Sequence, residues 1–289
     1  MILLVTHKDL DGAACEVVMR LVWGSDLTVW YSDYRELYGV CERVIAYAKD
    51  YETIIFADIA PVAEHLDVIN AHPLCERFQI YDHHAQNAWA EQRWPNIRGV
   101  FDNRCGARIL YESGPQYATL EPMETRALGS FLRAVDAWDR WLLDSPDRAL
   151  GEKLQHAFNF YRKSFVRDIV TSIQGGQVLR TDIDDVVKVL QEQQQGYVKS
   201  ACQRSRVDTD IWGNSFCWAV ASRFSSEVGS ELSKGHDYGA VVNLERGVVE
   251  LRSTGGFNVG VLAKQRGGGG HATAAGYPIG GITKSLFNL

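Results

Sequence analysis

The sequence predicts an α/β protein in which a doubly wound parallel sheet is joined by a helical connector to a smaller α+β domain. Three observations lead to this fold class. Short apolar runs alternate with helix-like segments over the first hundred residues, the pattern then becomes mainly helical up to a polar, glutamine-rich segment, and strand-like runs return after residue 205. We therefore expect an N-terminal domain over residues 1–180, a connecting helix over 181–205 and a C-terminal domain over 206–289.

The N-terminal strands are predicted from short apolar runs, at residues 2–5, 27–31, 53–56 and 78–81. Helices are predicted after the first three of these runs, at residues 12–23, 36–48 and 61–71. Pro61 suits the first turn of the last of these helices. Short buried strands separated by helices indicate a parallel sheet that is covered on both faces. Further helices are expected over residues 105–113, 121–141 and 150–175.

The C-terminal part has a different pattern. Strands are predicted at residues 215–221 and 240–244, and the second of these is joined through the turn residues ERG to a strand at 248–252 as a hairpin. A short helix at 259–264, the glycine tract GGGGH and a strand at 274–279 follow. These elements predict a small sheet with one or more helices.

The composition is that of a globular protein, with 46% hydrophobic and 23% charged residues among 289. No run of 18 apolar residues occurs, and the N-terminus lacks the features of a signal peptide, so we expect a cytoplasmic protein without membrane attachment. The six cysteines are far apart with no C-x-x-C pair. Neither a zinc knuckle nor a disulfide framework is therefore predicted.

The net charge of −6 argues against a protein that holds long duplex DNA or other long nucleic acid by broad electrostatic attraction, because that mode requires a basic face. A short anionic substrate remains compatible with this charge. Bound divalent cations can invert the local charge of an acidic site.

The stretch YDHHAQ places two histidines directly after a predicted strand. Adjacent side chains on extended backbone point to opposite faces, so His83 and His84 are expected to serve different purposes. A histidine pair alone is more often part of an ordinary surface or core. A functional interpretation needs other ligands at the same place.

Such ligands follow the other predicted strands. His7, Asp9 and Asp11 occur in THKDLDGA, and Asp58 occurs in FADIAP. Each group alone could be a helix cap or a loop aspartate. In open parallel sheets, however, the carboxyl ends of the strands share one crevice, where these residues would meet Asp82, His83 and His84. Four carboxylates and three histidines would repel and desolvate one another there, which predicts two divalent metal ions. Mixed ligation of this kind suits Mn²⁺, with Mg²⁺, Fe²⁺ or Co²⁺ as substitutes.

A further carboxylate is available in FLRAVDAWDRW, where Asp136 and Asp139 lie three residues apart on a predicted helix. Considered alone, this segment favours a surface position for both aspartates. With a metal crevice in need of another anion, Asp136 is the preferred ligand, and the choice between Asp136 and Asp139 stays open.

Five ordered motifs resemble the DHH phosphoesterase superfamily: THKDLDGA, FADIAP, YDHH, FLRAVD and the C-terminal GGGGHATAAG. The last is similar to the signature of the DHH-associated substrate-binding domain, and the likeness covers nearly the whole chain. The first motif is His-x-Asp-x-Asp, whereas many members have two more residues between the histidine and the first aspartate. The shorter form resembles a subset that degrades short oligoribonucleotides.

The resemblance implies a role for each residue of the crevice. One metal ion would be bound by His7 and Asp9, and the other by Asp11, His83 and Asp136. Asp58 would bridge the two ions. Asp82 would support the ligands without binding a metal, and His84 would face the scissile phosphate. One of the adjacent histidines would thus serve the metal and the other the substrate.

In the second domain the candidate substrate-binding residues are Arg252, Ser253, Asn258, Arg266, the glycines Gly268, Gly269 and Gly270, and His271. Without the family resemblance, GGGGH is more simply a flexible surface turn. With it, the glycines let the backbone approach a nucleotide, His271 can stack on a base and Arg252 can bind a phosphate. Trp138 and Trp141 could also stack on bases, although such residues more often belong to the core.

The sequence therefore predicts a metal-dependent phosphodiesterase that acts on short single-stranded oligoribonucleotides from an end and releases nucleoside monophosphates. The alternatives are hydrolysis of a linear or cyclic dinucleotide and removal of phosphate from adenosine bisphosphate. A sensor that binds nucleotides without turnover would not need two metal ions, and an inorganic pyrophosphatase would not need a domain that recognises a base. The oligomeric state stays open, a homodimer included.

Overall fold

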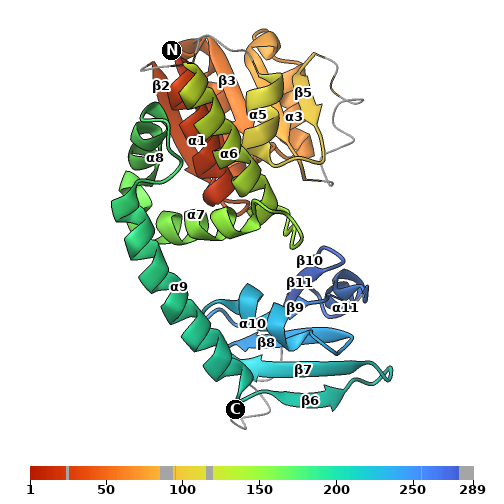
Figure 1. Ribbon diagram of the computed structural model, residues 1–289. Helices are drawn as coiled ribbons and strands as arrows, with labels where there is room; N and C mark the ends of the chain where they lie inside the picture. Colours follow the sequence, from red (N-terminus) through yellow and green to blue (C-terminus); the bar gives the residue numbers. More distant parts are fainter. Residues whose placement is uncertain (24–25, 85–93, 95, 115–119, 255, 280–289) are drawn as a thin grey trace. The chain divides into compact units, whose positions relative to one another are not determined.

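The computed structural model describes residues 1–23, 26–84, 94, 96–114, 120–254 and 256–279 (Figure 1). The chain divides into two compact units, Met1–Lys188 and Val189–Leu289. The division falls within one long helix, α9 (Thr181–Cys202), which matches the predicted connecting helix. The assignment of a catalytic and a substrate-binding domain to the two sides of this helix stays a prediction.

The first unit contains a five-stranded, entirely parallel sheet in the order β2-β1-β3-β4-β5. Its strands are β1 (Ile2–His7), β2 (Leu27–Ser32), β3 (Thr53–Ala57), β4 (Phe78–Asp82) and β5 (Arg98–Phe101). The predicted parallel sheet is confirmed. The edge strand β5 was missed because its four residues, RGVF, are only half-buried or exposed and do not form an apolar run.

Helices cover both faces of this sheet. Alternate side chains of β1 enter opposite cores: Leu4 packs with the helices on one face, and Leu3 and Val5 pack with those on the other. The first face carries α1 (Leu10–Trp23), α5 (Gly106–Ser113), α6 (Pro122–Asp139), α7 (Arg148–Tyr161) and α8 (Phe165–Gln174), of which α1, α5 and α6 lie side by side in Figure 1. The second face carries α2 (Leu37–Ala46) and α3 (Ala63–Asn70).

In the described part of the first unit, three short 3-10 helices interrupt the connections. They are η1 (Ala48–Asp50), η2 (Cys75–Arg77) and η4 (Arg162–Ser164). The predicted helix over 150–175 is thereby divided into α7 and α8, with η4 at the corner between them.

The two tryptophans at the end of α6 contact an arginine. The guanidinium carbon of Arg148 lies 4.1 Å from the ring centroid of Trp138 and 4.1 Å from that of Trp141. The same guanidinium donates hydrogen bonds to the carbonyl oxygens of Ala137 and Trp138. The structure therefore uses both rings to close the end of this helix, which favours the core interpretation over base stacking.

The second unit contains a six-stranded mixed sheet in the order β10-β11-β9-β8-β7-β6. Its strands are β6 (Arg206–Thr209), β7 (Ser215–Val220), β8 (Tyr238–Asn243), β9 (Val248–Arg252), β10 (Gly269–Gly270) and β11 (Ala274–Pro278). The predicted hairpin of β8 and β9 is confirmed.

Two helices pack on opposite faces of this second sheet. The core under α10 (Ser225–Leu232) includes Val241, and the core under α11 (Val259–Gln265) includes Ala240, the neighbouring residue of β8. Because β7 and β8 are parallel, they need a crossover connection, and α10 is that connection. The polar sequence SSEVGSEL did not predict this helix.

All six cysteines are free thiols, as predicted. Among the helices in the described part of the chain, none has both the length and the apolar character that a membrane crossing requires.

Candidate metal centre

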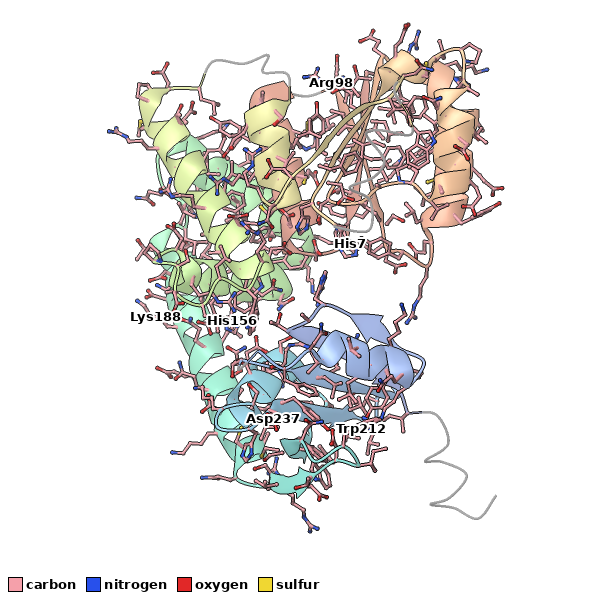
Figure 2. The ribbon with its side chains drawn as sticks, turned by 90° about the vertical axis from the view of Figure 1, so that its right-hand side faces the viewer. His7, Arg98, His156, Lys188, Trp212 and Asp237 are labelled. Atoms are coloured by element: carbon pink, nitrogen blue, oxygen red, sulfur yellow. The ribbon has the colours of Figure 1, made fainter. Side chains whose placement is uncertain are left out.

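The carboxyl ends of three neighbouring parallel strands deliver the predicted residues. His7, labelled in Figure 2, is the last residue of β1, Asp58 directly follows β3, and Asp82 is the last residue of β4. A Cβ atom at Gly12 would lie 2.0 Å from the carbonyl oxygen of His7. Only glycine therefore lets α1 begin so close to the end of β1.

Asp58 is held by its backbone in an unusual conformation. Its φ of 59° lies in the left-handed region, where a residue other than glycine costs about 1–3 kcal/mol. Its N–H donates to the carbonyl oxygen of Tyr81 at 2.9 Å. A Cβ atom at Gly106 would lie 2.6 Å from the Cβ of Asp58, so the glycine at the start of α5 makes room for this side chain.

His7, Asp9 and Asp58 form a first group of potential ligands, with ligand atoms within 4.8 Å of one another. His7 Nδ1 lies 2.5 Å from Asp9 Oδ2 and 3.9 Å from Asp58 Oδ2. The other oxygen of Asp9 accepts a hydrogen bond from the N–H of Gly12 at 2.9 Å. Asp9 therefore caps α1 and also faces His7, so the capping and ligand interpretations are compatible.

His83 is central to two further groups, Asp11 with His83 and Asp139, and Asp58 with His83 and His84. His83 Nε2 lies 3.2 Å from Asp58 Oδ1, 3.4 Å from Asp139 Oδ2 and 4.0 Å from Asp11 Oδ2. Asp58 and His83 each belong to two of the three groups. A carboxylate shared by two groups, as Asp58 is, suits two adjacent cations.

Asp11 is fixed by the N-terminus of α5. Its two oxygens accept hydrogen bonds from the N–H groups of Gly106 at 2.6 Å and Ala107 at 3.0 Å. These bonds orient the carboxylate and satisfy two of the free donors at the helix start.

Buried polar atoms without hydrogen-bond partners gather in this cluster. Among the described residues four such side-chain atoms are found, and three of them are Asp58 Oδ2, His83 Nε2 and Asp139 Oδ2. A buried polar atom without a partner costs about 1–3 kcal/mol. Cations bound between these nitrogen and oxygen atoms would remove that cost. The donor set therefore fits divalent metal ions that accept mixed imidazole and carboxylate ligation.

The electrostatics of the cluster support the same conclusion. Burial, followed by the charges of Asp9, Asp11 and Asp139, raises the pKa of Asp58 well above its ordinary value. Burial and the charges of Asp11 and Asp9 raise the pKa of Asp139 in the same way. Burial lowers the pKa of His83, which favours the neutral ring that a metal ion requires. Positive charge bound among these carboxylates would favour their ionised form.

A pH dependence of stability follows for the protein without metal. Because the pKa values of Asp58 and Asp139 are higher in the folded chain than in the unfolded chain, the folded state binds more protons above about pH 4. The free energy of unfolding should therefore fall as the pH rises from about 5 to about 7.5, measured by urea unfolding with a chelator present. Asp58→Asn should reduce this fall, and an unchanged slope would contradict the assignment.

The contacts of the two aspartates of α6 favour Asp139 as the proposed ligand. Asp136 was preferred as the ligand, but its Oδ1 accepts the N–H of Cys105 at 2.7 Å and its Oδ2 lies 3.1 Å from Arg108 Nη1 and 3.5 Å from Arg140 Nη1. Asp139, almost one turn later, reaches His83 instead. The spacing could not decide between them because residues three apart share one side of a helix.

If Asp139 is the ligand, the two matched substitutions Asp139→Asn and Asp136→Asn should have different effects. Asp139→Asn should weaken metal binding and lower activity with little change in the stability of the metal-free protein. Asp136→Asn should leave a buried site beside two arginines without its negative charge and destabilise the fold by about 1–3 kcal/mol. Metal titration and urea unfolding of both variants measure the two effects, and a reversed pattern would restore Asp136 as the ligand.

Asp82 and His84 form a separate pair. Asp82 Oδ1 accepts hydrogen bonds from His84 Nδ1 at 2.7 Å and from the N–H of His83 at 2.9 Å. Asp82 is fully buried and thus sets the orientation of the His84 ring. With Nδ1 bonded to Asp82, the Nε2 atom of His84 is the one available to a ligand.

Tyr34 is a residue of this region that the sequence interpretation missed. Its ring centroid lies 5.5 Å from that of His7 and 5.8 Å from that of His84. Burial and the charge of Asp82 raise the pKa of Tyr34, so its hydroxyl stays protonated. Its position in the sequence could have indicated it, because Tyr34 closely follows β2. Residues that follow the parallel strands reach the same edge of the sheet.

In the second unit the candidate polar residues differ in their accessibility. Ser253 is buried, and its hydroxyl donates to the carbonyl oxygen of Asp237 at 3.2 Å. Asn258 caps α11 by accepting the N–H of Val261. Both side chains thus have partners within the fold. Arg252 is half-buried and donates to Ser226 Oγ at 2.6 Å.

Three of the glycines in GGGGH have distinct environments. A Cβ atom at Gly268 would lie 2.0 Å from the carbonyl oxygen of Gly276, and Gly270 has a φ of 137°. These two glycines are required by the close pairing of β10 with β11. Gly269 has open space in place of a side chain, and it lines a groove of about 410 Å³ together with Arg252.

His271 and Arg266 lie near the same tract. The N–H of His271 donates to the carbonyl oxygen of Ala274, and its side chain is exposed. The guanidinium carbon of Arg266 lies 5.2 Å from the Tyr277 ring centroid and 5.6 Å from the Trp212 ring centroid. Among the candidates of this unit, the exposed ones are Asn258, Arg266, Gly269, Gly270 and His271. Arg252 is half-buried but lines the groove together with Gly269.

The chain is similar to a characterised nuclease in sequence. It is 23% identical over 301 aligned positions to oligoribonuclease NrnB of Bacillus subtilis (strain 168), and the match covers 98% of this chain and 74% of the relative. No protein-family model matches the chain.

Solved structures share the fold over nearly all of the chain. A DHH-domain protein, PF0399, matches with a TM-score of 0.68 at 12% identity, over 99% of this chain and 84% of its own. The pGpG-specific phosphodiesterase PggH of Vibrio cholerae matches with a TM-score of 0.58 at 15% identity, and the match covers 99% of this chain and 95% of that protein. RecJ of Thermus thermophilus, in complex with Mn²⁺, matches with a TM-score of 0.52 at 14% identity, and the match covers 99% of this chain and 50% of RecJ.

The five motifs, the parallel sheet with its ligand cluster at the strand ends, the separate mixed sheet and the similarity to an oligoribonuclease agree with one another. The chain is therefore similar in sequence to an oligoribonuclease and shares the fold of solved structures that include a DHH-domain protein.

Proposed function

We propose that this protein is a metal-dependent phosphodiesterase that degrades short oligoribonucleotides from an end and releases nucleoside 5′-monophosphates by a two-metal mechanism. The observation that carries the proposal is Asp58, a buried carboxylate shared by two groups of potential ligands, one on each side. Its unpartnered Oδ2 atom and its raised pKa both favour a cation on that carboxylate.

In this proposal His7 and Asp9 bind one ion, Asp11, His83 and Asp139 bind the other, and Asp58 binds both. When bound, Mn²⁺ or a similar divalent ion would supply Lewis acidity and make water nucleophilic near neutral pH. The residues 1–180 would thus form the catalytic domain, and the residues 206–289 the substrate-binding domain.

The protein side chains position the reacting phosphate. Asp82 holds the His84 ring through Nδ1, which directs the opposite ring atom, Nε2, toward a phosphate oxygen. When the ring is protonated, Nε2 also carries a hydrogen, and a donor that is already oriented in this way stabilises charge as it develops on that oxygen. Asp11 keeps its orientation through the N-terminus of α5 and does not have to reorganise during the reaction.

The short substrate is supported by the names of two similar proteins, an oligoribonuclease and a pGpG-specific phosphodiesterase. The exposed His271 and the groove lined by Arg252 and Gly269 offer a base-stacking side chain and a phosphate ligand for one nucleotide. The same features fit a linear or cyclic dinucleotide or adenosine bisphosphate. These are the alternative substrates, and a nucleotide sensor without turnover is the alternative class.

One experiment ranks these alternatives. The purified protein is incubated with Mn²⁺ and labelled RNAs of two to twenty nucleotides, with cyclic dinucleotides and with adenosine bisphosphate. We expect hydrolysis of the shortest RNAs first, with nucleoside 5′-monophosphates as products. Turnover of adenosine bisphosphate or cyclic dinucleotides alone would replace the oligoribonucleotide by that substrate, and binding without products would identify a sensor.

If the first domain carries out the reaction and the second binds the nucleotide, the effects of Arg252→Ala and His271→Ala should depend on the substrate. Both variants should keep most of their activity on bis(p-nitrophenyl) phosphate, which lacks the nucleobase and the further phosphate that these side chains are proposed to bind. On a short oligoribonucleotide each should lose about tenfold to a hundredfold in kcat/KM, because a phosphate contact or a base stack is worth about 1–3 kcal/mol. Equal losses on both substrates in folded variants would place these residues in the chemical step.

A further inference from the structure

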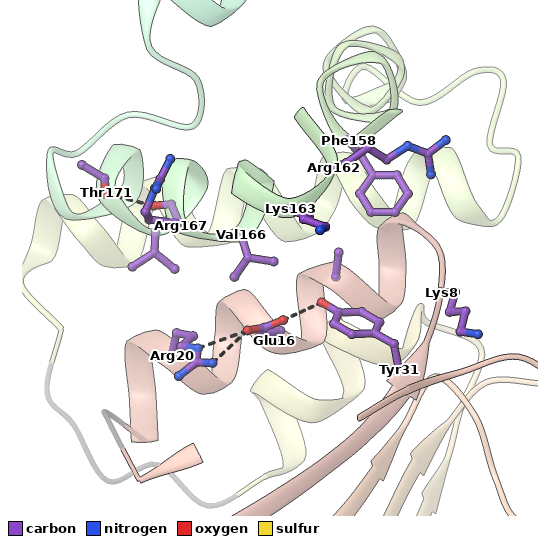
Figure 3. Close-up of a pocket in the computed structure, with 12 residues that line it drawn as sticks. Lys8, Glu16, Arg20, Tyr31, Phe158, Arg162, Lys163, Val166, Arg167 and Thr171 are labelled. Carbon is purple, nitrogen blue, oxygen red and sulfur yellow. Dashed lines mark hydrogen bonds and ion pairs between the residues drawn. The ribbon is translucent and has the colours of Figure 1, made fainter. Parts of the chain in front are cut away.

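A second cavity of the first unit lies between α1 and the corner formed by α7, η4 and α8. It has a volume of about 620 Å³, within the range of cavities that bind small ligands (Figure 3). Its lining contains five basic side chains, Lys8, Arg20, Arg162, Lys163 and Arg167, and a single acidic one, Glu16. We call this cavity the basic groove.

The acidic side chain of the basic groove is already satisfied. Arg20 donates to Glu16 Oε1 through Nη2 at 3.0 Å, and the Tyr31 hydroxyl donates to Glu16 Oε2 at 2.6 Å (Figure 3). Both oxygens are thus engaged, and the charge of Glu16 is balanced by that of Arg20. Of the four other basic side chains, Lys8 is paired with Glu36 and Arg167 contacts Asp168, so the excess of positive charge comes from Arg162 and Lys163. The whole chain has a net charge of −6.

Two of the remaining cations lack a carboxylate partner. Arg162 and Lys163 are exposed, and no ion pair joins either of them to another residue in the described part of the chain. Arg167 contacts only the neighbouring Asp168, at 3.3 Å, and is 77% exposed. Unpaired cations that line a cavity favour an anionic ligand.

The backbone of Arg162 has an unfavourable conformation. Its φ of 43° and ψ of −104° place a residue other than glycine in a sparsely populated conformation at the end of α7. Its guanidinium carbon lies 5.9 Å from the ring centroid of Phe158, which also lines the groove. Val166 and Val170 add further apolar surface. The groove therefore offers cations beside an aromatic ring, which suits a phosphate chain that carries sugars and bases.

The basic groove begins next to the proposed metal centre. Lys8, one of its lining residues, lies in the chain between His7 and Asp9, two of the proposed ligands. Its ammonium group is held by Glu36 at the start of α2. The lining of the groove thus includes a residue at the N-terminal end of α1, beside the proposed ligands.

We propose that the basic groove binds the phosphate backbone of single-stranded RNA beyond the dinucleotide that contains the scissile bond. This inference rests on the proposed function and adds a determinant of substrate length to it. An RNA of five nucleotides would contact Arg162 and Lys163, whereas a dinucleotide would not reach them.

The test compares two double variants with the same change of charge. Arg162→Glu/Lys163→Glu reverses the two unpaired cations of the groove, and Lys49→Glu/Arg126→Glu reverses two exposed cations elsewhere in the first unit. For the groove variant we expect KM for a five-nucleotide RNA to rise by about tenfold or more, with less than about a twofold change for a dinucleotide. The control variant should match the wild type on both substrates.

Binding is measured independently of turnover by fluorescence anisotropy of a labelled five-nucleotide RNA, in protein that carries Asp58→Asn. Each lost phosphate contact lowers the slope of log Kd against log salt by about 0.7 for a single strand, so the groove variant should lose about 1.4. The further variant Arg162→Gly removes the side chain and relieves the strained backbone. It should bind the RNA more weakly while its Tm stays equal to or above that of the wild type.

The outcomes separate this inference from the proposed function. If the wild type hydrolyses short RNA and the groove variant is unaffected on five nucleotides, the basic groove is not a substrate site although the function stands. If no RNA is hydrolysed but the five-nucleotide RNA binds with a salt slope that the groove variant loses, the groove binds RNA and the proposed function fails. Equal losses on the dinucleotide and the five-nucleotide RNA would overturn the role in length selection, and absence of RNA binding would overturn both proposals.

Discussion

Asp58→Asn is expected to lower kcat on a short oligoribonucleotide by at least about a hundredfold to a thousandfold, because a shared carboxylate positions both cations. Asparagine has the same shape and tolerates the left-handed backbone of this position, where φ is 59°. The folded structure should therefore persist, and the loss should lie in metal binding. Steady-state kinetics over a range of Mn²⁺ concentrations and elemental analysis of the dialysed protein measure both effects.

Asp144→Asn provides the matched control, since Asp144 is an exposed aspartate of the same unit that lies outside the groups of potential ligands. It should leave kcat and metal content unchanged. Near-normal turnover in Asp58→Asn, or full activity of the wild type in excess chelator, would reject the two-metal mechanism. Loss of activity in Asp58→Asn with normal metal content would instead limit Asp58 to the chemical step.

The adjacent histidines should differ when each is replaced by alanine. His83→Ala should weaken metal affinity at least about tenfold, because His83 Nε2 lies among three carboxylates and no protein donor satisfies it. His84→Ala should keep the metal content and lower kcat by about a hundredfold to a thousandfold, because it removes an oriented donor to the phosphate. Elemental analysis and single-turnover kinetics of the two variants measure this difference.

Asp82→Asn extends the comparison of the histidines. Because Asp82 acts by orienting the His84 ring, its substitution should lower kcat in the same direction as His84→Ala but less strongly, with the metals retained. Equal loss of metal in His83→Ala and His84→Ala would show that both histidines are ligands. The grouping of Asp58 with His83 and His84 would then describe one complete ligand set.

Most of the fold could be predicted from local patterns in the sequence. The apolar runs of β1, β2, β3 and β4 and the helical segments between them are each encoded within about ten residues, so the parallel sheet was predictable from chain order alone. Strands and helices without such a pattern were missed, among them β5, β6, α10 and β10. The edge strand β5 is too short and too exposed to form an apolar run, and α10 is largely polar because it buries only a narrow side.

The place of the metal centre was predictable for the same reason, whereas its exact membership was not. Parallel strands bring their carboxyl ends to one edge, so His7, Asp58 and His83 had to approach one another. The rotation of α6 about its axis, together with the contacts of Arg108 and Arg140, determines which of its two aspartates lies beside them. The spacing of the two aspartates in the sequence predicts neither of these.

The sequence by itself thus determined the parallel sheet and the edge at which the candidate ligands meet, because these depend on patterns that are local along the chain. Only the tertiary structure decided that Asp139 replaces Asp136 beside His83, and that Gly106 makes room for Asp58. It alone also brought together the basic groove, whose cations come from segments more than a hundred residues apart. Contacts between distant segments depend on how helices pack on the sheet, and this packing is set by the shape of the whole core.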